Sequence, residues 1–497
     1  GRGVTQNQKM AMLKPSRPLW LCLRQHVGGR RALCSQAKKE QLRVAIVGAG
    51  PAGFYTARTL LKKVEDARID IIEMLPTPFG LVRYGVAPDH AETKNVQKEF
   101  EQVMNTPGCS FMGGVTVGQD VSVAELRGMY HAVVMAYGAS GDAALGIPGE
   151  GLEGSMSARR LVNWYNGHPH FASMKVDLTA GSRAVVIGNG NVAVDVARVL
   201  LRPLDELSKT DMADYALEEL GRSTIEEVDV VGRRGPAQAA WTTAELREIV
   251  GMSCSVRFRE EEMVLDSVDE GYVAANRARK RAMALLNQTL EASRAAEGEG
   301  VQGKRLNLRF LMSPTEILGE GGRVSSVRLE RNILSGNADK RKASGTSNFE
   351  DFDCSLVLRS VGYQSKGIPG LPFDETRHTV PHSAGSVLKA PDGERETGLY
   401  VSGWLKRGPS GIIGSNIACG QITAMSLLDD WEAGRLGADR TGGDGLRELL
   451  RERGVRVVDL EGWHRIDAHE LERGIAAGRP RIKITSVSEM LDVAKAQ

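Results

Sequence analysis

Two stretches of the chain share one order of apolar and polar positions. In each stretch a short apolar run meets a glycine-rich turn, and a helix-like stretch follows. The first apolar run covers residues 44–47 and the second covers residues 184–187. Short, continuous apolar runs next to glycine turns are typical of strands buried in a parallel sheet. The pattern therefore predicts two strand-turn-helix units in one chain.

Both turns follow the dinucleotide-binding pattern G-x-G-x-x-G/A. The first glycine of this pattern permits a tight turn, and the second lets the backbone approach a pyrophosphate. The third small residue lets the helix pack on the strand, and the N-terminus of the helix faces the phosphates. The positions of the first turn are Gly48, Gly50, Ala52 and Gly53, and those of the second are Gly188, Asn189, Gly190, Asn191, Val192 and Ala193.

The strands that follow the two turns end differently. Residues 69–73 end in Glu73, about where an acid binds the ribose hydroxyls of a dinucleotide. Residues 227–232, which follow a polar and helical insertion at 203–222, end in Arg233 and Arg234. Guanidinium groups at this place favour the 2′-phosphate of NADP. The alternative is an ordinary solvated turn, but the position at the strand end favours phosphate binding.

Composition and cysteine spacing argue against several classes of function. A chain of 497 residues predicts two or three domains, and a net charge of +2 argues against a nucleic-acid partner. The six cysteines are scattered, without a C-x-x-C pair, which argues against a disulfide framework, a redox dithiol, a zinc ribbon and an iron–sulfur cluster. No metal site is predicted. The cysteines are Cys22, Cys34, Cys109, Cys254, Cys354 and Cys419.

The first 39 residues contain nine Lys or Arg and neither Asp nor Glu. An Arg-rich, acid-free beginning of this kind is typical of an organellar transit peptide, so residues 1–40 are predicted to be a targeting leader. The alternative is a disordered or untranslated leader, with translation starting at Met10 or Met12. No apolar run reaches the length of a membrane-spanning helix, which leaves at most peripheral membrane association.

The order of these units predicts an α/β protein with two Rossmann-like domains, in which the NADP domain is inserted into a discontinuous FAD domain. We expect the FAD domain at residues 41–145 and 356–497, and the NADP domain at 146–355. Residues 132–138, 356–363 and 398–404 are predicted strands of the FAD domain, and 411–428 a helix. Surface insertions are expected at 292–303 and 335–348, and mixed helix and strand over the final sixty residues.

Four longer blocks, at residues 78–90, 188–198, 231–236 and 402–409, resemble the adrenodoxin reductase family of glutathione-reductase-like flavoproteins. The resemblance extends from about Arg43 into the C-terminal region. It implies an NADPH:ferredoxin oxidoreductase with FAD and NADP as cofactors, which passes electrons one at a time to a [2Fe–2S] ferredoxin of adrenodoxin type. It also implies a monomer located in the mitochondrial matrix, either free or peripheral to the inner membrane.

The resemblance also implies contact residues for both cofactors. The implied FAD contacts are Ala52, Glu73, Leu81, Val115, Trp404, Gly411, Ile412 and Ile413. The implied NADP contacts are Asn189, Gly190, Asn191, Val192, Arg233, Arg234, Glu245 and Gly411. The chain departs from the family at the second turn, which reads Gly-Asn-Gly instead of Gly-Gln-Gly, and in the helix after Gly411. Neither departure removes a backbone donor.

His90 and Asp195 are the polar candidates for chemistry near the reaction centre. Passing single electrons onward requires a proton to leave the flavin, and a histidine with a carboxylate could relay it. The alternatives are a turn residue for His90 and a helix-surface or capping carboxylate for Asp195. In the same way, Trp404 could be a core aromatic residue and Gly411 an ordinary helix start.

An external electron acceptor is expected because the chain has no dithiol and no cysteine cluster. The acceptor implied by the resemblance is an acidic ferredoxin, which predicts a basic docking patch. Arg277 and Arg281, four residues apart in the basic run 277–281, would share one helix face. The alternatives for this run are a solvated helix face and a nucleic-acid patch. An NADPH oxidase or quinone reductase on the same fold remains the alternative enzyme, and a non-catalytic redox sensor the alternative of another class.

Overall fold

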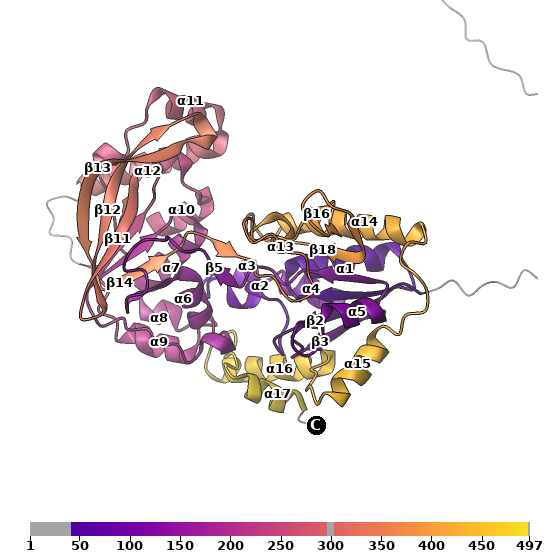
Figure 1. Cartoon of the computed structure of the whole chain (residues 1–497). Coiled ribbons are helices and arrows are strands. Elements are labelled where there is room, and N and C mark those ends of the chain that lie inside the picture. The colour runs from indigo at the N-terminus through magenta and orange to yellow at the C-terminus, as the bar shows by residue number, and fades with distance from the viewer. Residues whose placement is uncertain (1–40, 296–302, 496–497) are drawn as a thin grey trace, which may run out of the picture. The chain divides into compact units, whose positions relative to one another are not determined.

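The structure is a computed structural model that describes residues 41–295 and 303–495. The predicted leader at 1–40 lies outside the described residues, as do residues 296–302 of the first predicted insertion. From Gln41 onward the chain forms one compact unit. Within this unit we name two lobes, each by its large sheet (Figure 1).

The first lobe is built on a seven-stranded sheet with the order β16-β17-β18-β4-β1-β2-β3. Strands β3, β2, β1, β4 and β18 run parallel, whereas β16 and β17 pair antiparallel at one edge. The strands are β1 (Arg43–Val47), β2 (Arg68–Glu73), β3 (Cys109–Gly113), β4 (Ala132–Met135), β16 (His382–Ser383), β17 (Ser386–Leu388) and β18 (Arg395–Val401).

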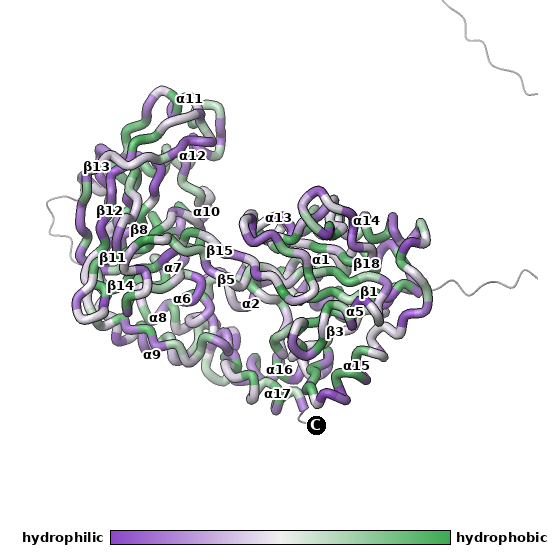
Figure 2. Tube along the Cα trace, in the orientation of Figure 1, coloured by the Kyte–Doolittle hydropathy of each residue, from purple (hydrophilic) through white to green (hydrophobic). Residues whose placement is uncertain are grey.

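Apolar side chains cover both faces of this sheet. Val44 and Ile46 of β1 contribute to one buried cluster, and Ala45 and Val47 to another, because alternate residues point to opposite faces. The green central strands in Figure 2 show this apolar character. The helices of the first lobe are α1 (Pro51–Lys63), α2 (Leu81–Tyr84), α3 (Ala91–Lys94), α4 (Gln97–Met104), α5 (Val123–Met129), α13 (Trp404–Arg407) and α14 (Ser415–Glu432).

The second lobe is built on a six-stranded sheet with the order β6-β14-β7-β8-β10-β9, all pairs of which are parallel. Its strands are β6 (Ser155–Ser157), β7 (Arg183–Ile187), β8 (Glu227–Val231), β9 (Ser255–Phe258), β10 (Arg305–Arg309) and β14 (Leu356–Arg359). Its helices are α6 (Ala158–Tyr165), α7 (Asn191–Leu201), α8 (Leu204–Leu207), α9 (Asp214–Gly221), α10 (Thr243–Val250), α11 (Ser267–Ala275) and α12 (Arg277–Ala295). Helices α8 and α9 confirm that the insertion at 203–222 is helical.

The second lobe lies, in the sequence, between the two parts of the first, which confirms the predicted α/β class and the inserted domain. One strand was assigned to the wrong sheet. Strand β14 was expected to return to the first lobe, but it pairs with β7 and β6 of the second. The return therefore comes after Arg359, through β15 (Tyr363–Gln364), which pairs with β5 (Gly141–Asp142) on the outgoing connection.

The structure refines one further expectation and corrects another. The polar residues 335–348 are mostly exposed, as predicted for a surface insertion, and most of them lie in the ends of β12 (Arg323–Ser335) and β13 (Lys342–Asp353), which form an antiparallel sheet with β11 (Met312–Glu320). Strand β13 is exposed over most of its length, so its sequence lacks an apolar pattern. Mixed helix and strand were expected over the last sixty residues, but up to residue 495, where the description ends, they contain helices and no named strand, namely α15 (Gly443–Glu452), α16 (Leu460–Ala476) and α17 (Val487–Lys495).

None of the helices in the described part of the chain is both long enough and apolar enough to cross a membrane.

His168, which follows α6, is a half-buried histidine whose protonation opposes folding. Its ring packs against Tyr84 of α2 and Phe171, with ring centroids 4.9 and 5.2 Å away. Burial, with smaller effects from His170 and Arg159, lowers its pKa to about 3 from the ordinary 6.5. Because the folded state takes up this proton less readily than the unfolded chain, stability is full above pH 6.5 and falls as the pH drops toward 3.

We expect the free energy of unfolding of His168→Phe to lose less between pH 8 and pH 5 than that of the wild type. The difference should be about 2 kcal/mol, because one pKa unit corresponds to about 1.4 kcal/mol. Urea unfolding of the FAD-loaded protein at both pH values measures it. An identical loss in the two proteins would show that His168 protonates freely in the folded state.

Candidate functional site

The first glycine turn connects β1 to α1. Gly48 has a φ of +111°, and a Cβ atom there would lie 2.6 Å from the carbonyl oxygen of Ala136, just after β4. A Cβ atom on Gly53 would lie 2.2 Å from the carbonyl oxygen of Gly48. By contrast, a Cβ atom on Gly50 would meet nothing within 4 Å. The first and last glycines are thus required for packing, and the middle one borders open space at the N-terminus of α1.

Several predicted FAD contacts lie around this turn. A Cβ atom on Gly80, next to Leu81, would lie 3.4 Å from the Cα of Gly50, and the amide of Phe79 donates to the carbonyl of Ala49. The backbone of Val115 donates to the carbonyl of Glu73 over 2.9 Å. A Cβ atom on Gly403, next to Trp404, would lie 2.5 Å from the Cβ of Ala52. Four segments far apart in the sequence therefore meet at the carboxyl edge of the first sheet.

Glu73 ends β2 beside this turn, as predicted. Its carboxylate accepts hydrogen bonds from the amides of Ala49, over 2.9 Å, and Leu75, over 3.2 Å. Burial raises its pKa, while the three backbone amides of Ala49, Leu75 and Met74 act in the opposite direction. Fixed in this way, the carboxylate lies at the strand end that borders the ribose in a dinucleotide-binding unit.

Trp404 begins α13 directly after β18. Its ring stacks on that of Tyr363, with centroids 5.3 Å apart, and its indole N–H donates to the carbonyl of Ser410 over 3.2 Å. Ile412 follows with 68% of its surface exposed, which is unusual for so large an apolar residue. Helix α14 starts at Ser415 and not at Gly411 as predicted, because Gly411 has a φ of +84° and belongs to a turn.

The second glycine turn, which connects β7 to α7, has the same backbone geometry as the first. Gly188 has a φ of +126°, and a Cβ atom there would lie 2.2 Å from the carbonyl oxygen of Ser360, just after β14. A Cβ atom on Gly190 would meet nothing within 4 Å. The side-chain amide of Asn191 donates to Glu245 over 2.7 Å. Open space therefore lies at the N-terminus of α7, as it does at that of α1.

Two buried oxygen atoms in this second turn, and the side chains of two arginines that follow the neighbouring strand, have no hydrogen-bond partner among the described residues. The side-chain carbonyl oxygens of Asn189 and Asn191 are buried and accept no hydrogen bond within the protein. Arg233 and Arg234 follow β8, and a Cβ atom on the preceding Gly232 would lie 2.7 Å from the side-chain nitrogen Nδ2 of Asn189. Neither arginine side chain forms an ion pair or hydrogen bond among the described residues. Unused polar groups and an open helix N-terminus fit a phosphorylated dinucleotide.

Of the two predicted catalytic residues, His90 has a direct partner that is not Asp195. The Nε2 atom of His90 lies 2.7 Å from Glu248 of α10, whereas its Nδ1 atom lies 4.0 Å from Asp195 of α7. Arg198, fully buried, donates to Asp195 over 2.8 Å, to Glu248 over 3.2 Å and to Asp89 over 2.6 Å. His90 and Asp195 therefore belong to one network, which joins the segment after α2 to helices of the second lobe.

Burial shifts the pKa values of Tyr363 and Asp195. It raises the pKa of the Tyr363 phenol, the charge of Arg159 opposes this rise, and the charges of Asp195 and Asp142 add to it. Burial also raises the pKa of Asp195 itself, although Arg198 and His90 oppose the rise. Sequence reasoning missed Glu248 and Arg198. The spacing of three between Asp195 and Arg198 on α7, and between Glu245 and Glu248 on α10, was the available signal.

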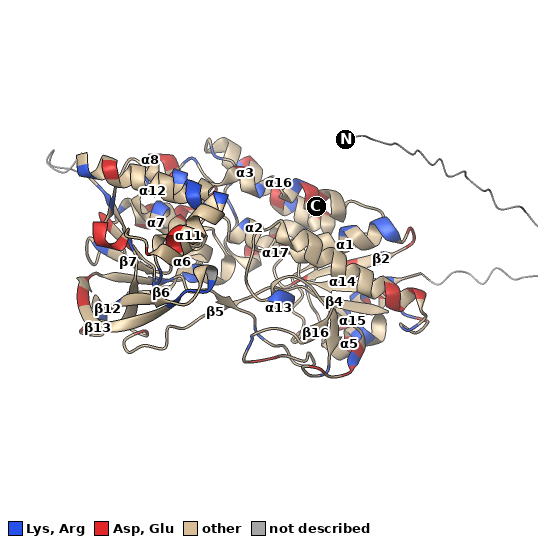
Figure 3. Cartoon of the chain, turned by 90° about the horizontal axis from the view of Figure 1, so that it is seen from above, with Lys and Arg blue, Asp and Glu red and all other residues tan. Residues whose placement is uncertain are grey.

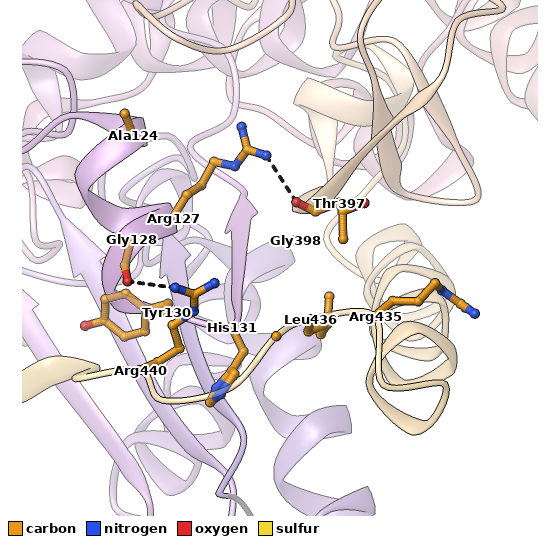
Figure 4. Close-up of a pocket in the computed structure, with 11 residues that line it drawn as sticks. Ala124, Arg127, Gly128, Tyr130, His131, Thr397, Gly398, Arg435, Leu436 and Arg440 are labelled. Carbon is orange, nitrogen blue, oxygen red and sulfur yellow. Dashed lines mark hydrogen bonds between the residues drawn. The ribbon is translucent and has the colours of Figure 1, made fainter.

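The two predicted docking arginines, Arg277 and Arg281, are exposed at the start of α12. The blue segments of α12 in Figure 3 mark its Lys and Arg residues. A cavity of about 470 Å³ lies elsewhere, in the first lobe. Figure 4 shows that Arg127, Arg440 and His131 line it. It lies at the amino ends of β4 and β18, opposite the glycine turns, so it is not a dinucleotide site. Within the described residues no cluster of His, Cys, Asp or Glu could hold a metal ion.

The chain was compared with known proteins. Residues 42–248 match the family described as pyridine nucleotide-disulphide oxidoreductase. The chain is 46% identical to the mitochondrial NADPH:adrenodoxin oxidoreductase of Arabidopsis thaliana over 93% of its own length and 97% of the relative's. It is 43% identical to the human protein of that name, with 90% and 91% covered.

A solved structure supports the same relationship. FprA from Mycobacterium tuberculosis in complex with NADPH matches with a TM-score of 0.84 and 41% identity, covering 92% of this chain and all of that one. Proteins with such identity over nearly their whole length share a fold and its site architecture. The chain belongs to the NADPH:adrenodoxin oxidoreductase family.

Proposed function

We propose that this protein is an FAD-dependent reductase that passes electrons from NADPH, one at a time, to a [2Fe–2S] ferredoxin of adrenodoxin type. The observation that carries the proposal is the pair of glycine turns, each with open space at its middle glycine, of which only the second is bordered by unpaired arginines. When bound, FAD would supply the redox chemistry that takes up two electrons as a hydride and passes them on one at a time.

The residues around each turn have separate tasks. Gly50 and the N-terminus of α1 bind the FAD pyrophosphate, and Glu73 orients its ribose. Gly190 and the N-terminus of α7 bind the NADP pyrophosphate, while Arg233 and Arg234 bind its 2′-phosphate. Trp404 and the turn at Gly411 border the ring system of FAD. Together these groups hold the two dinucleotides in fixed geometry, which is what hydride transfer requires.

The cysteines support an external acceptor. The described ones, Cys109, Cys254, Cys354 and Cys419, are all unpaired. Burial, with a smaller contribution from a nearby aspartate in each case, raises the pKa of Cys109 and of Cys354 to about 12. Thiols of this kind are poor nucleophiles. No two of these four described cysteines form a disulfide, and Cys109 and Cys354 are poor nucleophiles, which favours a separate protein as the acceptor.

The proposal is tested by incubating the FAD-loaded protein anaerobically with NADPH and an excess of an acidic [2Fe–2S] ferredoxin. Catalytic amounts should bleach the visible absorption of the ferredoxin completely. The alternative, an NADPH oxidase or quinone reductase, predicts that NADPH is consumed with oxygen or a quinone while ferredoxin stays oxidised. The matched control is NADH, which the arginine pair should disfavour.

We place the ferredoxin at the exposed start of α12. Replacing Arg277 and Arg281 by glutamate should raise the KM for ferredoxin about tenfold or more and flatten its salt dependence, because both charges would face an acidic partner. Reduction of ferricyanide by NADPH should not change. If ferricyanide reduction falls in parallel, the two arginines support the fold and do not dock the partner.

We assign His90 and Asp195 to a proton relay, which now includes Glu248. His90→Gln should lower the rate of ferredoxin reduction about tenfold and flatten its dependence on pH, because glutamine cannot carry a proton. Steady-state rates measured from pH 6 to pH 9 test this, with FAD content as the control for folding. A pH profile that keeps its shape in the variant would mean that His90 only holds Glu248 in place.

The same proposal extends to location and assembly. The acid-free beginning of the chain and the mitochondrial names of the eukaryotic relatives support a mitochondrial matrix protein. We expect a monomer with at most peripheral contact to the inner membrane.

A further inference from the structure

The basic run at the start of α12 divides between two faces of the helix. Ala282, Met283 and Leu286 form the buried face of α12. Arg279 precedes Ala282 and Met283 by three and four residues and therefore shares their face, and it is partly buried. Lys280, the next residue, is exposed. The inward position of Arg279 separates it from the surface that we assign to ferredoxin.

Arg279 contacts the loop that follows β8. Its guanidinium donates a hydrogen bond to the backbone carbonyl of Ala239. The amide of the next residue, Ala240, donates to the carbonyl of Asn189 in the second glycine turn over 2.9 Å. Arg279 is thus one residue away from the backbone bond that holds this loop against the predicted NADP turn.

Arg233 and Arg234 belong to the same loop after β8 that Arg279 contacts at Ala239. Burial lowers the pKa of Arg234, and the charges of Arg233 and Arg279 lower it further. All three guanidinium groups therefore either belong to this loop or bond to it, and the loop is bonded to the second turn. Like charges at short range repel one another unless an anion lies between them.

The protein itself supplies no such anion. Among the described residues, Arg233, Arg234 and Arg279 form no ion pair with any carboxylate. The nearby Arg341, by contrast, is paired with Asp266. A phosphate monoester, with three acceptor oxygens and up to two negative charges, has the charge and the geometry to join three guanidinium groups.

We infer that Arg279 is a third guanidinium of the 2′-phosphate site and contributes to the preference for NADP over NAD. The inference rests on the proposed NADP site, and it assigns to α12 two tasks on two faces. Its inward face recognises the nucleotide, and its exposed start recognises the ferredoxin. Two other roles are possible for Arg279: it could only hold the loop at Ala239, or it could belong to the docking surface.

Binding of 2′,5′-ADP and 5′-AMP to the FAD-loaded protein, measured by calorimetry, separates these roles. The two probes differ only in the 2′-phosphate. Arg279→Gln should weaken 2′,5′-ADP about tenfold, the loss of one charge-assisted hydrogen bond, and leave 5′-AMP within twofold. Arg279→Lys keeps the charge without the fork of donors, so it should lose about threefold. Lys280→Gln, the matched control on the outer face, should bind both probes like the wild type.

Three results would overturn the inference. Equal losses of both nucleotides in Arg279→Gln would mean that the residue only supports the loop. Unchanged 2′,5′-ADP binding in Arg279→Gln, with weakened binding in Arg233→Ala, would remove Arg279 from the site and leave the proposed NADP site standing. Unchanged 2′,5′-ADP binding in both variants would overturn the NADP site as well. If Arg279→Gln does not fold, Arg279→Lys still decides, because a loss confined to 2′,5′-ADP supports the inference and any other pattern contradicts it.

Discussion

Replacing both Arg233 and Arg234 by alanine should raise the KM for NADPH about 100-fold or more and leave the KM for NADH nearly unchanged. Each charge-assisted hydrogen bond to the 2′-phosphate contributes about 1.5–3 kcal/mol, which is about tenfold or more per residue. NADH lacks the phosphate. Steady-state kinetics with ferricyanide as acceptor and each nucleotide in turn measure the ratio.

Single variants and a neutral control refine this result. Each alanine variant alone should lose about tenfold, and the double variant should approach the product, unless the two arginines bind the same phosphate oxygen. Arg222 is an exposed arginine of the same lobe that pairs with Glu219, so Arg222→Ala should leave the KM for both nucleotides unchanged. Equal losses for NADPH and NADH in the double variant would mean that the arginine pair is structural.

Gly50→Val should produce a folded protein that retains little FAD. The backbone of Gly50 is extended, with a φ of −93°, so a branched side chain fits the conformation. Because nothing in the protein lies within 4 Å of the added Cβ, the side chain would fill the space that we assign to the pyrophosphate. Such a clash costs about 3 kcal/mol, or about 100-fold in affinity.

The measurement is flavin absorbance per mole of purified protein, with circular dichroism as the test of folding. Gly151→Val is the matched control, since a Cβ atom on Gly151 also meets nothing within 4 Å but lies far along the chain from either turn. Full FAD content in Gly50→Val would place the pyrophosphate elsewhere. Gly53→Ala is unsuitable for this test, because its Cβ atom would lie 2.2 Å from a backbone oxygen and would disturb the fold itself.

The strands and turns that carry the cofactor sites could be predicted because their signals are local. A buried strand, a tight turn and a helix start occupy about ten consecutive residues, and each has its own residue preference. The end residues Glu73, Arg233 and Arg234 follow from the same register. For these segments the structure also explains why Gly48 and Gly188 must be glycine. A Cβ atom on either residue would clash with the backbone just after β4 or β14.

The sheet to which strand β14 belongs could not be predicted from the local sequence. The first three residues of this strand are as apolar as those of β4, and nothing in them specifies which sheet the strand joins. The structure shows that β14 has the same place in the second lobe as β4 has in the first, next to the strand that leads into the glycine turn. Equally, β13 was missed because both of its faces are mainly exposed, so it lacks an alternating pattern.

The polar network at His90 could not be predicted for a different reason. His90 and Glu248 are 158 residues apart in the sequence, and their contact depends on how the segment after α2 meets α10. His90 and Asp195, named as candidates by residue type, belong to one network in the structure, and Glu248, the direct partner of His90, was not predicted. Arg279 was included in a single basic run because a run of charges does not show that its members point to opposite sides of a helix.

The most direct test of the proposed function is reduction of cytochrome c by NADPH with and without a [2Fe–2S] ferredoxin. The purified, FAD-loaded protein should reduce cytochrome c rapidly only when ferredoxin is added, because ferredoxin carries single electrons away from the flavin site. Reduction at the full rate without ferredoxin would contradict the account and favour an NADPH oxidase or quinone reductase on the same fold.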